Sequence, residues 1–438
     1  MPRRYVSHKS TYFFRNPTNN SRSLILIFGD EVETTGNQQN NRSEVIYRNR
    51  RGWVQSDRLM PEHPLELYII DVGQGDSTII VTPAGRKILI DGGRGNEAFQ
   101  FLVWKYRLDL PTANPVEIDL MVLTHADEDH IAGLVSIIEH PLIEVKEIVH
   151  SGIAKYASGV FNTELGQRVG SGSNSVLVTR HDGIADLAIH NLSDNMQAWH
   201  DAVVAESGIR YRAVDTRTAA IDVADPLINI SVLGPRLINH PGQQQPVYRW
   251  HGSASKTING HSVVLRIDYE NVRILFPGDL NAKGARHLMA DPNFGLATDA
   301  HVFKAPHHGS HDFHPPFLQA VHPQISVISS GETPDHGHPR ASFLGMLGKS
   351  SRGDKPLLFS TELVALFTVD EDAAMPDADD AADPTDPAMI GQARRRFKKR
   401  LNGIINVRTD GEHLYAARRV AAGYQFVTYG PMSPSQGG

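Results

Sequence analysis

Four side chains that bind metals well lie within six residues near the middle of this sequence. They are His125, Asp127, Asp129 and His130, and they follow an apolar run at 118–123. Such a run is typical of a buried strand, and the apolar residues after His130 are typical of a helix. Because neighbouring carboxylates repel one another, a divalent cation would convert that repulsion into binding free energy. The spacing favours a metal site at a strand end, although an acidic residue before an apolar run can also simply cap a helix.

The composition restricts which metal ligands are available. The chain has 438 residues with 22 histidines and no cysteine, so disulfides and thiolate-bound metals are excluded. Any metal must therefore be held by histidine and oxygen ligands. We expect zinc or manganese, and a set rich in carboxylates shifts the preference toward manganese.

Charge and hydropathy limit the partners. A net charge of −6 and a pI near 6.4 give no overall attraction to nucleic acid, so such binding would need a local basic patch. No apolar run approaches the roughly 18 to 20 residues of a membrane span, and no apolar segment follows the N-terminal arginines. These features predict a cytoplasmic protein without a membrane partner.

The central segment, T-H-x-D-x-D-H-x-x-G at 124–133, resembles the metal-binding motif of the metallo-β-lactamase superfamily, which is usually H-x-H-x-D-H. Asp127 stands where most members have the second histidine, which is similar to the branch typified by the competence protein ComEC. Further segments match that branch in order: DVGQGDS at 71–77, LIDGG at 89–93, VLGP at 232–235, NGHSVVL at 259–265, LFPGDL at 275–280, APHHGS at 305–310 and GHP at 337–339. The resemblance implies an α/β fold, an αββα sandwich, with metal-dependent hydrolase activity.

The resemblance also implies roles for residues outside the central motif. Asp279 matches the carboxylate that bridges two divalent metal ions, and His338 matches the final histidine ligand. The remaining histidine ligand is expected to be His261, but the branch often has asparagine there, which leaves Asn259 as the alternative or as a substrate contact. Asp91 matches the carboxylate that supports the metal ligands from behind.

The histidines of APHHGS suggest the reaction. Imidazoles near a phosphate can hydrogen-bond the transition state or donate a proton to the leaving oxygen. We therefore expect His307, His308 and Asp129 to be catalytic in a phosphodiesterase or nuclease that uses a water activated by two metals. A hydrolase of esters, thioesters or lactones is the first alternative, because one fold hosts many functions. A binding or regulatory protein that keeps the metal without turnover is the second.

We expect the substrate to be nucleic acid or a small nucleotide. Two basic clusters and one single lysine could contact its phosphates. Residues 48–51 with Trp53 could contact phosphates, although such loop tips are more often simply solvated. Lys256 precedes the NGHSVVL segment and could face substrate. The second cluster could bind phosphates or balance the acidic stretch before it, and comprises Arg394, Arg395, Lys398 and Lys399.

The chain divides into four parts by pattern. Residues 1–64 predict a small β extension, which could bind a protein partner, and 65–369 predict the main domain with an insertion at about 150–258. The acidic, Ala-rich and Pro-rich segment 370–387 has too few apolar residues to fold alone, which predicts a disordered loop. Residues 388–432 predict a basic helix and closing strands of the same domain.

Overall fold

The structure is a computed structural model of the chain, and it describes residues 1–331, 337–353, 356–362, 403–419 and 426–434. The acidic stretch at 370–387 lies outside the described residues. So do Arg394, Arg395, Lys398 and Lys399 of the expected basic helix. What the sequence predicts for these segments stays a prediction.

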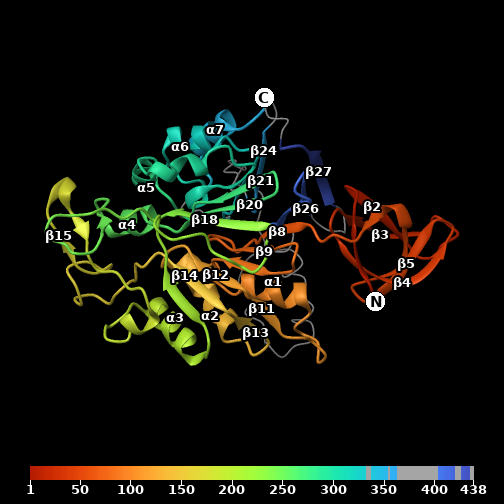
Figure 1. Cartoon of the computed structure of the whole chain (residues 1–438), viewed down its shortest axis with the longest axis horizontal. Helices are drawn as coiled ribbons and strands as arrows, with labels where there is room; N and C mark the ends of the chain where they lie inside the picture. The colour runs from red at the N-terminus through yellow and green to blue at the C-terminus, as the bar shows by residue number, and fades with distance from the viewer. Residues whose placement is uncertain (332–336, 354–355, 363–402, 420–425, 435–438) are drawn as a thin grey trace, which may run out of the picture.

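Two central β-sheets lie face to face (Figure 1). The first has nine strands, in the order β17 (Arg210–Ala213), β14 (Glu147–His150), β12 (Leu120–Leu123), β10 (Lys87–Ile90), β9 (Thr78–Val81), β8 (Leu65–Ile69), β25 (Ile405–Thr409), β26 (Leu414–Arg419) and β27 (Phe426–Met432). The second has six strands, in the order β18 (Ile228–Gly234), β20 (Val264–Tyr269), β21 (Val272–Phe276), β22 (Val302–Lys304), β23 (Ile325–Ile328) and β24 (Leu357–Ser360).

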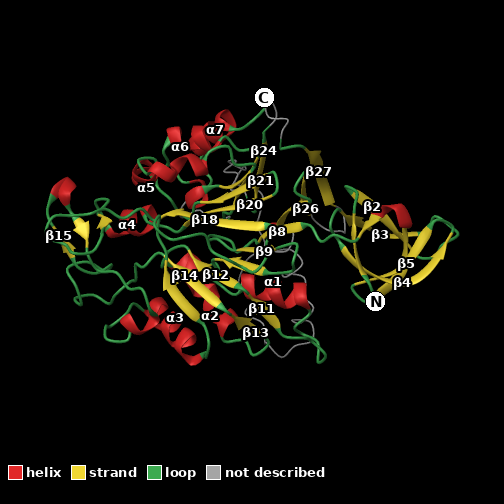
Figure 2. Ribbon diagram, viewed as in Figure 1, coloured by secondary structure: helices red, strands yellow, loops and turns green. Residues whose placement is uncertain are grey.

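Helices cover the outer faces of both sheets (Figure 2). Against the first sheet pack α1 (Glu97–Tyr106), α2 (Glu128–Ile138) and α3 (Asp194–Ala205), while α5 (Ala282–Leu288), α6 (Pro315–Val321) and α7 (Ala341–Ser350) pack against the second. Three buried apolar clusters fill the spaces between these layers, and the central one comes from the strands of both sheets. This confirms the predicted αββα layer order.

The segment 150–258, predicted as an insertion, partly belongs to the central sheets, because it supplies β17 to one and β18 to the other. Its remainder holds a three-stranded sheet of β15 (Arg168–Val169), β16 (Val176–Leu177) and β19 (Tyr248–Arg249), and the helix α4 (Ala254–Gly260).

A separate pair of short strands, β11 (Val116–Ile118) and β13 (Ile143–Val145), flanks α2. Short 3-10 turns are η1 (Ser56–Arg58), η2 (Gly172–Asn174), η3 (Ile184–Asp186), η4 (Pro292–Ala297) and η5 (Pro306–Gly309). Of the helices described, none combines the length and apolar character that a membrane crossing requires.

The N-terminal residues form a separate seven-stranded sheet beside the sandwich (Figure 1). Its strand order is β3 (Arg22–Ile27), β2 (Ser10–Phe14), β6 (Arg50–Gln55), β5 (Arg42–Tyr47), β4 (Glu31–Gln39), β1 (Arg3–Val6) and β7 (Leu59–Met60). The Arg48 guanidinium lies 4.2 Å from the centre of the Trp104 ring and donates to the Trp104 carbonyl at 2.9 Å. Arg48, for which solvation was the favoured interpretation and phosphate contact the alternative, thus joins this sheet to α1.

A buried arginine joins the N-terminal sheet to the sandwich more strongly. Arg408 on β25 is only 5% exposed, donates to Asp30 at 2.9 Å and to the Tyr68 hydroxyl at 2.8 Å, and forms an ion pair with Glu66 at 3.2 Å. Burial alone would raise the pKa of Glu66, but Lys105 and Arg408 outweigh burial and lower it to about 2. Both carboxylates therefore depend on Arg408 for compensation of their charge.

Replacing Arg408 with methionine is expected to lower the free energy of unfolding by about 3 to 5 kcal/mol, because it leaves buried carboxylates without this partner. Urea denaturation of the full chain measures that change. Arg3→Met is the matched control, since Arg3 and Glu31 form an exposed pair at 3.3 Å that contributes about 1 kcal/mol or less. Equal losses for the two variants would show that the Arg408 network does not stabilise the fold.

Candidate active site

The candidate active site forms where strands of both central sheets end. His125 follows β12, Asp91 follows β10, Asp279 follows β21 by a short turn, and His307 and His308 follow β22 within η5. β10 and β12 are parallel neighbours, as are β21 and β22, so each pair presents its carboxyl ends at one edge. The apolar strands thereby hold polar side chains that are distant in the sequence at a single place.

Asp91 orients His130. Its carboxylate accepts hydrogen bonds from the Thr124 amide at 2.8 Å and the Thr124 hydroxyl at 2.7 Å, and lies 2.8 Å from Nδ1 of His130. Because a carboxylate accepts, Nδ1 of His130 donates to Asp91 and Nε2 is left to bind a cation once its own proton is released. The position that the sequence assigned to Asp91 thus has the expected geometry of a supporting carboxylate.

His308 is oriented in the same way by a backbone carbonyl. Its Nδ1 donates to the Ser329 carbonyl at 3.0 Å, and its Nε2 lies 3.2 Å from Oδ2 of Asp279 and 3.4 Å from Oδ2 of Asp129. His307 and His308 both have a left-handed backbone, with φ of 48° and 52°. Such strain costs about 1 to 3 kcal/mol per residue and is typical of functional sites.

The clustered side chains fit a divalent cation. Among the described residues, His125, His130 and Asp279 can offer ligand atoms within 4.8 Å of one another, as can Asp129, His130 and His308. Nε2 of each of the three histidines and Oδ1 of Asp279 are buried without a hydrogen-bond partner. Buried polar atoms seldom lack partners, and neutral imidazole with carboxylate is a normal donor set for zinc or manganese. The arrangement therefore supports binding of divalent metal.

The charges in the cluster are strongly coupled. Burial alone would raise the pKa of Asp279, but His308 and His130 hold it well below its usual range, and the same histidines lower the pKa of Asp129. Conversely, burial would lower the pKa of His130 and His308, but the neighbouring carboxylates raise both well above the usual value. Protons thus occupy the histidines when no cation is bound, and metal binding must release them.

Asp127 lies at the start of α2 but does not cap it. Its side chain makes no capping hydrogen bond and instead lies 3.4 Å from Nε2 of His125 and 2.5 Å from Nζ of Lys155. Burial would raise the pKa of Asp127, but His125 and Lys155 outweigh burial and lower it to about 2. Asp127 is thus an ionised carboxylate directed at the cluster, and the capping explanation does not account for it.

Besides Asp127, two further predicted ligands lie outside the clustered sets. Nε2 of His261 donates to the Arg249 carbonyl at 2.8 Å, and its ring stacks on His251 with centroids 4.8 Å apart. The C-terminal end of α4 turns His261 toward this second histidine group. His338 lies beside the cluster, with its ring centroid 6.3 Å from that of His308. His308 was expected to be catalytic, but it lies among the possible metal ligands. The sequence had assigned that role to His261 and His338.

Asn259 lies closer to the cluster than His261 does. Its amide fits best when its nitrogen donates to the Ser255 carbonyl at 3.1 Å and to Oδ2 of Asp127 at 2.9 Å. The other end of the amide lies 3.4 Å from Nε2 of His307. Of the two alternatives for this position, the structure thus brings Asn259, and not His261, to the site.

Three further residues belong to the site but were not among the candidates from the sequence. Lys304 on β22 is buried and pairs with Asp76, and its Nζ lies 4.0 Å from Oδ1 of Asp279. Asp76 also lies 3.4 Å from Nδ1 of His308. Lys155 contacts Asp127, as described above. A lysine inside an apolar strand was a signal for Lys304, and the DVGQGDS segment was a signal for Asp76.

The comparisons with known proteins agree with this geometry. The family model described as "Metallo-beta-lactamase superfamily" matches residues 70–314, which include all the residues of the ligand sets described above. The chain belongs to the metallo-β-lactamase superfamily. Family and site together identify a metal-dependent hydrolase of that superfamily.

A curated relative identifies the branch. Over 301 residues the chain is 25% identical to ComE operon protein 3 of Bacillus subtilis (strain 168), and the match covers 65% of this chain and 31% of that protein. This similarity confirms the ComEC-like branch that the motifs indicated. The chain thus spans about a third of the length of that relative.

Two solved structures are similar at low identity. A protein of Parabacteroides distasonis described as a metal-dependent hydrolase has a TM-score of 0.33 at 13% identity, and the match covers 68% of this chain and 94% of that chain. A motif mutant of a metallo-β-lactamase from Cronobacter sakazakii has a TM-score of 0.29 at 12% identity, with coverages of 65% and 90%. We assign the family from the family model, since both TM-scores are low.

Proposed function

We propose that this chain is a phosphodiesterase that acts on nucleic acid or on a small nucleotide with two divalent metal ions, zinc or manganese. The carrying observation is the character of the cavity beside the metal cluster. Every residue that lines it is polar, namely Ser255, Lys256, Asn259, Asn281, His307, Ser310, His311 and Asp312. An acyl or thioester substrate would favour an apolar pocket, whereas a charged diester favours polar and cationic groups.

The proposed ligands form two sets that share one carboxylate. His125 and Asp127 would hold one cation, Asp129, His130 and His308 would hold the other, and Asp279 would contribute to both. Cations at such a site polarise phosphoryl oxygens and activate water for attack. The two adjacent histidines would then have different roles. His308 would bind metal, and His307 would face the substrate.

The side chain of His307 is suited to contact a substrate. Its Nδ1 is buried without a hydrogen-bond partner, and the residue lines the cavity. Burial lowers the pKa of His307, so the imidazole is neutral at physiological pH. A neutral imidazole at this place can exchange a hydrogen bond with a phosphate oxygen and hold it in position.

The test compares two small substrates on the purified full chain. We expect release of nitrophenol from bis(4-nitrophenyl) phosphate that is lost with a chelator and restored by manganese or zinc, and no hydrolysis of an acyl thioester. Metal-dependent cleavage of the thioester alone would establish an acyl hydrolase instead. Metal binding without turnover of either substrate would favour a binding protein.

A further inference from the structure

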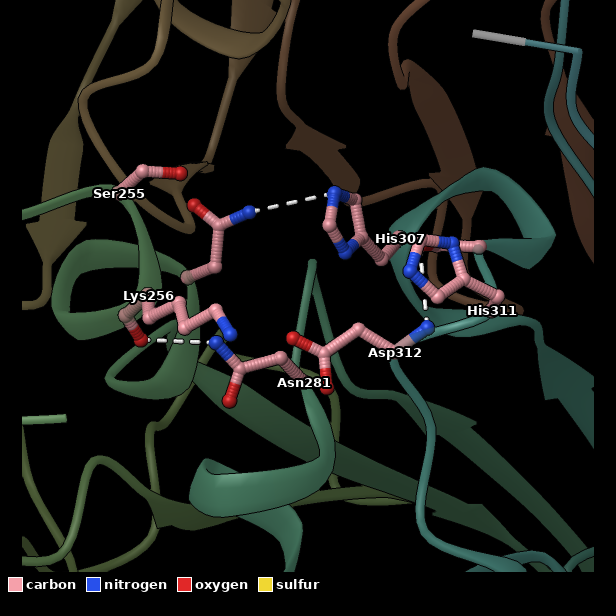
Figure 3. Close-up of a pocket in the computed structure, with 8 residues that line it drawn as sticks. Ser255, Lys256, Asn281, His307, His311 and Asp312 are labelled. Carbon is pink, nitrogen blue, oxygen red and sulfur yellow. Dashed lines mark hydrogen bonds between the residues drawn. The ribbon is translucent and has the colours of Figure 1, made fainter. Parts of the chain in front are cut away.

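The polar cavity beside the cluster has a volume of about 430 Å³ (Figure 3). It lies between α4, which carries Lys256, and the segment after η5, which carries His311 and Asp312. A cavity of this size accommodates a small ligand. All eight residues of its lining are polar, so it suits the polar part of a ligand.

Two opposite charges face this cavity. The ammonium of Lys256 and the carboxylate of Asp312 both point into it in Figure 3, and neither takes part in an ion pair within the described parts of the chain. Lys256 is exposed, so its charge is available to a ligand. An unpaired cation and an unpaired anion that line the same space fit a ligand with both an anionic group and hydrogen-bond donors.

The backbones of these two residues are fixed by α5. The Asn281 side chain donates to the Lys256 carbonyl at 2.7 Å, and the Ala282 amide donates to the Asp312 carbonyl at 3.0 Å. The Asp312 amide in turn donates to the Ser310 hydroxyl at 3.2 Å. Both side chains are therefore presented to the cavity from anchored positions, which reduces the conformational entropy that binding must overcome.

The cavity is continuous with the proposed catalytic site. Asn259 and His307 line it, and Asn259 also lies 2.9 Å from Oδ2 of Asp127. A phosphate at the metal cluster and a group in the cavity can therefore belong to one molecule.

We propose that this cavity binds the nucleotide unit next to the scissile phosphate, an assignment that rests on the proposed phosphodiesterase function. Lys256 binds the neighbouring phosphate through a charge-assisted hydrogen bond, and Asp312 accepts a hydrogen bond from the 2′-hydroxyl of the sugar. Recognition is then of the sugar and the phosphate. The preferred substrate is a ribonucleotide with phosphates on both sides of the sugar.

Calorimetric titration of the manganese-loaded full chain tests this assignment. Adenosine 3′,5′-bisphosphate is expected to bind at least about tenfold more tightly than adenosine 5′-monophosphate, since hydrogen bonds between charged groups are stronger than those between neutral groups. The Lys256→Gln variant should bind the bisphosphate and the monophosphate with similar affinity. Lys349→Gln, at an exposed position on α7, is the matched control and should keep the wild-type ratio.

The second arm replaces the ligand with 2′-deoxyadenosine 3′,5′-bisphosphate. The wild type is expected to bind it several-fold more weakly than the ribonucleotide, and Asp312→Ala should bind the two equally. Equal affinities in the wild type would overturn the role of Asp312, and an unchanged ratio in Lys256→Gln would overturn the role of Lys256. Titration detects binding without turnover, so these outcomes are distinct from the test of the proposed function. A failure to hydrolyse bis(4-nitrophenyl) phosphate would contradict that function.

Discussion

Hydrolysis of bis(4-nitrophenyl) phosphate is expected to fall by at least about a thousandfold when Asp279 is replaced by alanine. Asp279 is 3% exposed, lies 3.2 Å from Nε2 of His308 in one proposed ligand set, and can offer a ligand atom within 4.8 Å of one from His125 in the other. Loss of a shared carboxylate removes several kcal/mol of transition-state stabilisation, and each 1.4 kcal/mol or so is a factor of ten in rate. Steady-state kinetics measure the rate, and elemental analysis of the dialysed protein should show less metal.

Asp279→Asn separates charge from packing, because it keeps the size of the side chain and removes its negative charge. It should lose activity and metal to a similar extent. Asp109→Ala, on the exposed loop after α1, is the control and should change neither quantity. Full activity in a metal-depleted Asp279 variant would show that the cluster is not the catalytic centre.

The sequence predicted the parts of the fold and site that depend on local pattern or on the ordered motifs. Apolar runs predicted the strands, and the family resemblance assigned roles to Asp91 and Asp279. Both follow strands that have a parallel neighbour, and the carboxyl ends of parallel strands meet at one edge. The hydrogen bonds from Thr124 and His130 to Asp91 follow directly from that placement. The layer order could be predicted because the ordered motifs resemble a family of known fold. The metal cluster could be predicted because four ligand types lie close together at 125–130.

The remaining features depend on contacts and turns that no local pattern specifies. Lys304 and Asp76 are 228 residues apart, and only the packing of the two sheets brings them together. His308 enters the ligand cluster because two successive residues adopt positive φ, which sequence patterns do not predict for histidine. The side chain of His261 lies outside the cluster because the end of α4 directs it to the Arg249 carbonyl.

The adjacent histidines His307 and His308 are expected to fail in different ways when each is replaced by alanine. His308→Ala should lose metal and activity together, because Nε2 of His308 lies within 3.4 Å of both Asp129 and Asp279. His307→Ala should retain its metal, because His307 lines the cavity and belongs to none of the ligand sets found among the described residues. Its activity should still fall by about a hundredfold or more, as for loss of a positioned proton-transfer or hydrogen-bonding group.

The measurement pairs metal content with kcat and KM for each variant. A normal metal content with a reduced kcat in His307→Ala would support direct action on the substrate, whereas loss of metal in that variant would make His307 a ligand. The reverse pattern, with metal retained in His308→Ala, would contradict the ligand assignment for His308. Since both residues share the strained turn, thermal denaturation of the two variants after removal of metal should show similar changes, so that a difference in metal content cannot arise from the turn alone.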